Sequence, residues 1–207
     1  MSKKNIDINQ RIPLDTLEVA LISFLDNNYD NDYIIEQLRL EFSGDNRLKK
    51  GMRIVNKIIL KNPLNNWLLE NKELVKSAIK KKVDRDIVLV SLLNSAFPFS
   101  YDVLQTFGKY FSAQEIINSD TIKKSISNIY GGNRATENGL YSVIPMFLEA
   151  KFFTRPKQGL YEWKEPLIVT SPITKKIYEE SFKICNNTSE IHEHQKLDPY
   201  FLFVEEN

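Results

Sequence analysis

Apolar residues recur at helical spacing along the first half of the chain. The clearest stripe runs over Leu14–Leu25, where apolar side chains follow an i, i+3, i+4, i+7 pattern directly after Pro13. The same spacing predicts four more helices, over residues 31–42, 45–61, 64–82 and 84–96. Pro98 follows the last of them and marks the expected end of an N-terminal helical domain, residues 1–97.

After Pro98 the pattern becomes more specific. It predicts helices over residues 101–111 and 121–130, a Gly131-Gly132-Asn133 turn, and a third helix over 134–150. Two aromatic, β-prone runs, 152–155 and 160–163, then flank a turn at 156–159 that contains Pro and Gly, which predicts a β-hairpin. Helices with a glycine turn before the last one, followed by a hairpin, are typical of a winged helix-turn-helix. We therefore expect a mainly α protein in which a winged helix-turn-helix domain, residues 98–170, packs on the N-terminal helical bundle.

The last segment, residues 171–207, is predicted to hold one helix from Ser171-Pro172 to Cys185, after a short strand over 167–170. The tail that follows ends in the apolar run Pro199-Tyr200-Phe201-Leu202-Phe203-Val204. We expect this run to dock on the body of the protein. The alternative is a docking motif for another protein.

Charge is distributed unevenly, although the 207-residue chain has a net charge of only +1. Residues 46–82 carry eleven Lys or Arg against two acids, a local charge of +9, whereas residues 14–42 carry one Arg against seven acids, a local charge of −6. In the helix predicted over 45–61, four cations repeat every four residues, at Lys49, Arg53, Lys57 and Lys61. Such a column suits a polyanion such as a phosphate backbone. The alternative is that the acidic segment packs beside the basic one and neutralises it.

The third helix of the predicted winged segment supplies candidates for contact with bases. Its expected exposed side holds residues suited to bases or phosphates, Arg134, Asn138 and Tyr141, together with Ser142. Two residues oppose base reading: Glu137 brings a negative charge, and Pro145 is expected to kink or interrupt the helix because it removes a backbone bond to Tyr141. With the wing and the start of the second helix included, the candidate DNA-binding residues are Lys49, Lys50, Arg53, Lys57, Lys123, Lys124, Arg134, Asn138, Tyr141, Arg155 and Lys157.

Catalysis has no positive support in the sequence. The chain has no phosphate-binding or dinucleotide-binding glycine motif, and no nucleophile-elbow or HExxH motif. His192-Glu193-His194 beside Glu190 is the one cluster that resembles a metal site, but its spacing offers no further ligand. Cys185 is the single cysteine and is expected to be a buried or idle thiol. We therefore expect no enzyme activity, no metal, no cofactor and no small-molecule substrate.

The polar N-terminus lacks the apolar core of a signal peptide, and no run of apolar residues approaches the length of a membrane span. We therefore expect a cytoplasmic protein with no membrane partner.

The arrangement resembles the BrxA-type small accessory proteins of bacterial BREX phage-defence systems. The segments that carry the resemblance are the basic stretch 45–53, the apolar stretch 86–93 and the segment 121–163. The resemblance implies a non-enzymatic protein that binds double-stranded DNA within a multi-protein defence complex, and it transfers no functional residue to a particular position here. The alternative is a protein–protein adaptor that uses the winged segment and the apolar tail.

Overall fold

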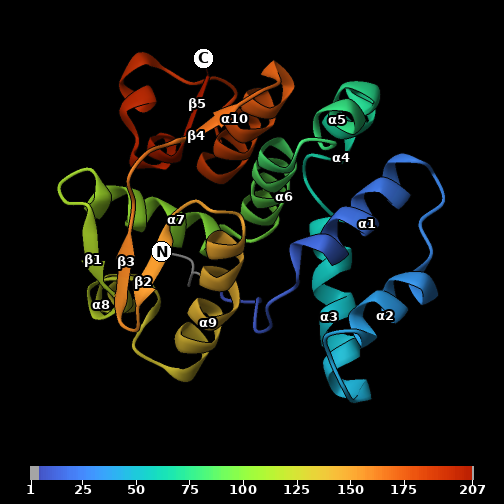
Figure 1. Ribbon diagram of the computed structural model, residues 1–207, viewed down its shortest axis with the longest axis horizontal. Helices are drawn as coiled ribbons and strands as arrows, with labels where there is room; N and C mark the ends of the chain where they lie inside the picture. The colour runs from blue at the N-terminus through green and yellow to red at the C-terminus, as the bar shows by residue number, and fades with distance from the viewer. Residues whose placement is uncertain (1–4, 207) are drawn as a thin grey trace.

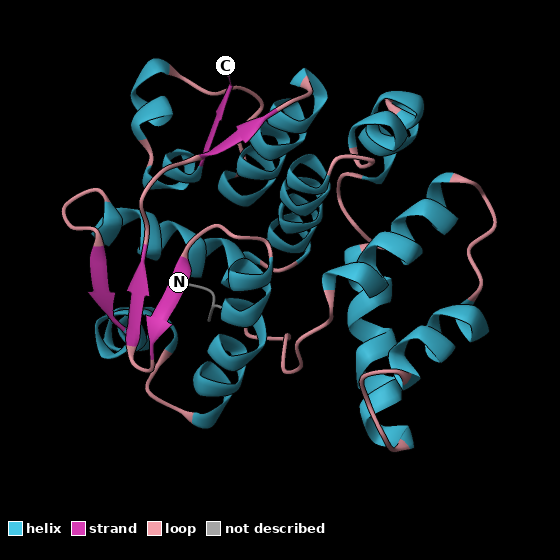
Figure 2. Cartoon of the chain, in the orientation of Figure 1, coloured by secondary structure: helices cyan, strands magenta, loops and turns pink. Residues whose placement is uncertain are grey.

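The computed structural model describes residues 5–206, and over that range it contains ten α-helices and a few short strands. The expectation of a mainly α protein is confirmed. Figure 1 shows helices α1 (Leu14–Leu25), α2 (Asn31–Arg39) and α3 (Asp45–Ile58) at one end of the molecule. The sheet that contains the hairpin lies at the other end, with α9 (Arg134–Glu149) between the two (Figure 2).

The helices of the N-terminal part follow the apolar pattern, with one correction. The single helix predicted over 64–82 is wrong, because the structure divides this stretch into α4 (Asn65–Glu70) and α5 (Lys72–Ala78). The break falls at Asn71, whose side-chain amide donates to the Trp67 carbonyl at 2.9 Å. An Asn that bonds to nearby backbone competes with the helical ladder, and apolar periodicity alone does not register that competition.

Helix α6 (Lys82–Ala96) lies at the centre of the molecule and is buried along most of its length. It packs against α1, α3, α7 (Pro98–Phe111) and, most extensively, α10 (Pro172–Asn186). A helix that is buried on nearly every side is typical of a position surrounded by other elements. Within the described residues, no single helix is long and apolar enough to cross a membrane; α6 and α7 together reach that length and composition, with a bend of 119° between them.

The C-terminal part begins with α7 and continues as β1 (Ile116–Asn118), α8 (Ser119–Tyr130), α9, β2 (Thr154–Lys157) and β3 (Leu160–Glu162). The predicted hairpin is confirmed: β2 and β3 pair antiparallel, and β1 pairs with the other edge of β3, which gives the strand order β1-β3-β2. Strand β1 was not predicted, because three residues are too few to show an alternating pattern. Helix α9 is continuous through Pro145, so an interruption there is wrong, and the kink expected as the other outcome stays a prediction.

Aromatic side chains fill the space between α7, the three-stranded sheet and the C-terminal segment. Phe107 stacks on Phe153 with ring centroids 4.2 Å apart, and Phe203 meets Phe111 edge-on at 6.3 Å. Phe203 belongs to the 3-10 helix η2 (Pro199–Phe203), which follows η1 (Glu193–Leu197) and leads into β5 (Val204–Glu206). Strand β5 pairs parallel with β4 (Leu167–Val169). The apolar tail therefore docks on the body of the protein, with Tyr200 and Phe203 fully buried.

The segment before α1 joins the two ends of the molecule. Its Ile8 and Ile12 are fully buried. Arg11 donates to the Glu149 carboxylate at the end of α9 at 2.6 Å, and the second oxygen of Glu149 accepts from the backbone N–H of Leu14 at 2.9 Å. Glu149 thus satisfies a backbone donor in the first turn of α1, which would otherwise have no partner inside its own helix.

Candidate nucleic-acid interface

Short local contacts fix the start of α9. Asn133 accepts from the backbone N–H groups of Ala135 and Thr136 at 2.9 and 3.1 Å, as an N-cap residue does. Gly131 has φ +90°, a conformation that an L side chain rarely adopts, and the Thr136 hydroxyl donates to its carbonyl at 2.6 Å. The turn between α8 and α9 therefore holds the first residues of α9 in a defined position.

Only a narrow stripe of α9 reaches solvent. Arg134, Asn138 and Tyr141 are exposed, and Tyr141 shows 74% of its surface. Ser142 was predicted to lie on this side but is buried, because its hydroxyl donates to the Asn138 carbonyl of the previous turn at 2.7 Å and needs no water. The opposite face of α9 is closely covered: a Cβ on Gly139 would come within 2.6 Å of the Phe99 ring.

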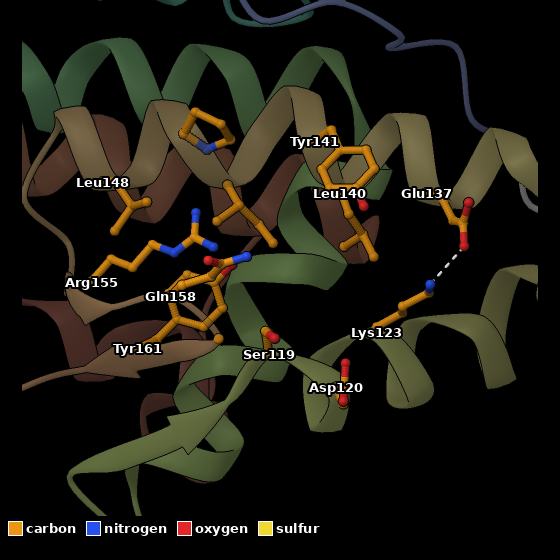
Figure 3. A pocket seen from close by; sticks show the side chains of 13 residues that line it. Ser119, Asp120, Lys123, Glu137, Leu140, Tyr141, Leu148, Arg155, Gln158 and Tyr161 are labelled. Atoms are coloured by element: carbon orange, nitrogen blue, oxygen red, sulfur yellow. Dashed lines mark ion pairs between the residues drawn. The ribbon is translucent and has the colours of Figure 1, made fainter.

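A groove of about 310 Å³ runs beside this stripe, between α9, the start of α8 and the hairpin. Figure 3 shows α9 along one wall, with Arg155, Gln158 and Tyr161 rising from the hairpin and Lys123 reaching up from α8. Leu140, Ile144 and Leu148 of α9 give the groove an apolar surface.

Glu137, the carboxylate that argued against phosphate binding, has a specific partner. Its side chain forms an ion pair with Lys123 at 2.6 Å, drawn as a dashed line in Figure 3. The hydrogen bond to Lys123 lowers the pKa of Glu137, and the same bond raises the pKa of Lys123. The cation of Lys123 is therefore already paired, and a phosphate bound by Lys123 would have to compete with Glu137.

The hairpin contributes exposed cations at the other wall. Arg155 places its guanidinium over the Tyr161 ring, 5.9 Å from the centroid, and Lys157 is exposed at the end of β2. Burial raises the pKa of the Tyr161 hydroxyl, while the charge of Arg155 opposes that effect. Lys124 is exposed on α8 next to Lys123. The structure thus brings Lys123, Tyr141 and Arg155 together in the lining of one groove, whereas Lys124, Arg134, Asn138 and Lys157 are exposed on the same elements and do not line it.

The basic column of α3 is divided. Lys57 is half-buried, pairs with the Asp7 carboxylate and lies 4.5 Å above the centre of the Phe97 ring, so a phosphate would have to compete with Asp7 for this cation. Arg53 is exposed, and its guanidinium donates to the Asp7 carbonyl at 2.9 Å. Lys49 and Lys50 are exposed, and no ion pair involves them in the part of the chain that the structure describes. Asp7 could not be predicted as the partner of Lys57, because the two residues are 50 positions apart in the sequence.

Some of the charge separation is neutralised inside the molecule. Lys76 of α5 pairs with Asp26, at the end of α1, at 2.6 Å. Lys49 and Lys50 belong to α3, which lies on the far side of α9 from the hairpin in Figure 1. The exposed cations of α3 and those around the groove are therefore two separate groups.

The candidate metal and thiol residues do not converge on this groove. Residues 5–206 hold no group of three or more His, Cys, Asp or Glu arranged to bind a metal ion. His192 and His194 are exposed, with parallel rings 5.8 Å apart. The Cys185 thiol donates to the Asn94 carbonyl at 3.3 Å, and burial raises its pKa well above the ordinary value.

Comparison with protein-family models, with curated proteins and with solved structures finds no match to this chain in any of the three.

Proposed function

We propose that residues 98–170 form a winged helix-turn-helix domain and that the protein binds double-stranded DNA, mainly through phosphate contacts. The observation that carries the proposal is the exposed stripe of α9, with Arg134, Asn138 and Tyr141, flanked by exposed cations of α8 and the hairpin. A helix that presents Arg and Asn from its first turns is suited to a major groove, and a hairpin with Arg and Lys is suited to the adjacent backbone.

The order of the elements supports this assignment. Helix α7, strand β1, helices α8 and α9, and the β2–β3 hairpin follow one another, and β1 adds to the hairpin as a third strand. A winged helix places its last helix beside such a sheet, with the hairpin as the wing. The Asn133 cap and the Gly131 turn give the α8–α9 connection the short form that this motif requires.

Two double charge reversals test the proposal. We expect Lys124→Glu with Arg134→Glu to weaken binding to a labelled duplex by about tenfold or more, because two phosphate contacts become repulsive. Lys80→Glu with Lys81→Glu is the matched control, since these lysines are exposed but belong to the connection before α6. Equal binding by the two variants contradicts the proposal.

A protein–protein adaptor is the second candidate, and a different surface favours it. Helices α2 and α3 form a hollow with apolar Ile35, Leu48 and Met52. Three cations, Arg39, Lys49 and Arg53, and one carboxylate, Asp45, also line it. This surface suits an apolar segment with acidic flanks. The apolar tail is not the adaptor surface in this structure, because Tyr200 and Phe203 are buried. If Lys49→Glu with Arg53→Glu abolishes function in cells while duplex binding is unchanged, the adaptor is favoured.

The accessory role in a BREX phage-defence complex stays a prediction from the resemblance of the sequence.

A further inference from the structure

The side chains that line the groove beside α9 carry equal numbers of positive and negative charges. Its lining holds two carboxylates, Asp120 and Glu137, and two cations, Lys123 and Arg155. Glu137 and Lys123 form an ion pair, and Asp120 is exposed at the start of α8. A phosphate placed in this groove would meet both carboxylates, whereas Lys124, Arg134 and Lys157 are exposed outside its lining. The groove itself therefore favours an uncharged ligand.

The shape and chemistry of the groove suit a flat ring. Tyr141 of α9 offers an exposed aromatic ring, and Arg155 of the hairpin presents a planar guanidinium above Tyr161. Tyr141, Arg155 and Tyr161 all line the groove (Figure 3). Gln158 and Ser119 add donors and acceptors at the rim.

The volume limits the ligand to a small one. About 310 Å³ lies at the lower end of the range of roughly 300–1,000 Å³ for small-molecule sites, which suits one planar ring system. The apolar floor of Leu140, Ile144 and Leu148 can cover one face or edge of such a ring, and the polar rim can bond to its exocyclic groups.

From these features we propose that the groove between α9 and the hairpin receives a single unstacked nucleobase, with Tyr141 and Arg155 as its stacking surfaces, while the surrounding cations hold the flanking phosphates. This inference rests on the proposed DNA binding. Aromatic and guanidinium faces bind bases of any sequence by stacking. Because removing a base from an intact duplex costs stacking and pairing energy, the groove selects DNA in which a base is already unpaired.

The experiment compares two labelled duplexes that differ in one nucleotide, one fully paired and one with a single unpaired base. Anisotropy titrations at one fixed salt concentration give the affinity ratio of the two duplexes for the full-length protein. We expect the wild-type protein to prefer the duplex with the unpaired base by roughly tenfold, as stacking of one base on an aromatic ring provides. Tyr141→Ala abolishes this preference, and Tyr141→Phe retains it because the ring remains.

Tyr33→Ala is the matched control, since Tyr33 is an exposed tyrosine of α2, away from the groove. Its preference is expected to equal that of the wild-type protein. Equal wild-type affinity for the two duplexes, or an unchanged preference in Tyr141→Ala, overturns the base-binding inference and leaves the DNA-binding proposal in place. Absence of binding to either duplex overturns both. If Tyr33→Ala also loses the preference for the unpaired base, the inference is overturned, because the preference would not depend specifically on the groove.

Discussion

At the scale of single residues, the Glu137–Lys123 ion pair sets how many cations around the groove are available for phosphates. The two side chains come from α9 and α8 and meet at 2.6 Å across the Gly131 turn. Because Lys123 lowers the pKa of Glu137, the carboxylate is ionised at neutral pH, and the pair is lost only as the pH falls through that lowered pKa.

Glu137→Gln is expected to tighten binding to duplex DNA, because it removes a negative charge and releases Lys123 for a phosphate. The salt dependence should steepen by about 0.9 in the slope of log affinity against log salt for the added contact. Glu193→Gln is the control, since Glu193 forms an exposed pair with Lys196 at the same distance, 2.6 Å, in η1. Weaker binding by Glu137→Gln, or an equal gain in the control, would contradict this account.

The exposed chemistry of α9 was largely predictable at this scale, and its exceptions have local causes. Arg134, Asn138 and Tyr141 lie on the exposed face as the apolar spacing indicated. Ser142 does not, because a serine hydroxyl can bond to the carbonyl one turn earlier and then be buried. The partners of Glu137 and Lys57 were not predictable, because ion pairs between elements depend on a packing that a single sequence does not display.

At the scale of elements, most helices were predicted from the apolar pattern, whereas the short strands β1 and β5 were not, because they leave too weak a pattern in the sequence. Strand β1 has three residues, and β5 pairs with β4 in parallel across the C-terminal segment. Pro145 was expected to kink or interrupt α9, and the helix is not interrupted. It packs on both α7 and α8, and this tertiary packing outweighs one missing backbone bond.

Helix α7 packs against the C-terminal segment at Gly108. A larger side chain at this position would clash with that segment. A Cβ there would lie 2.0 Å from the Pro199 carbonyl oxygen of η2. Gly108→Ala is therefore expected to lower the free energy of unfolding by about 1–3 kcal/mol or more, measured by urea denaturation. Gly132→Ala is the control, because the nearest atom to its Cβ is 4.0 Å away. Equal stability of the two variants would show that η2 does not pack on α7 as described.

At the scale of the whole molecule, the segment before α1 joins the N-terminal helices to α9. Its role was not visible in the sequence, because Ile8 and Ile12 stand singly among polar residues just before Pro13. Its contacts reach α3 through Asp7 and α9 through Arg11. The two ends of the molecule are thus connected by packing as well as by the chain.

Glu149→Ala tests this connection. The change leaves the Arg11 guanidinium and the Leu14 backbone N–H without their acceptor, so we expect a loss of about 1–3 kcal/mol in the free energy of unfolding. Glu70→Ala, at an exposed position of α4, is expected to stay within about 0.5 kcal/mol of the wild-type protein. If Glu149→Ala is as stable as Glu70→Ala, the contacts of Glu149 do not stabilise the connection between the two ends of the molecule.

Binding of duplex DNA over a salt series tests the central claim most directly. The exposed cations of α8, α9 and the hairpin that lie outside the groove lining, Lys124, Arg134 and Lys157, predict up to three phosphate contacts. Log affinity should then fall linearly with log salt, with a slope of about −2 to −3. No binding at low salt, or an affinity that does not change with salt, would contradict the proposal that this surface binds DNA through its phosphates.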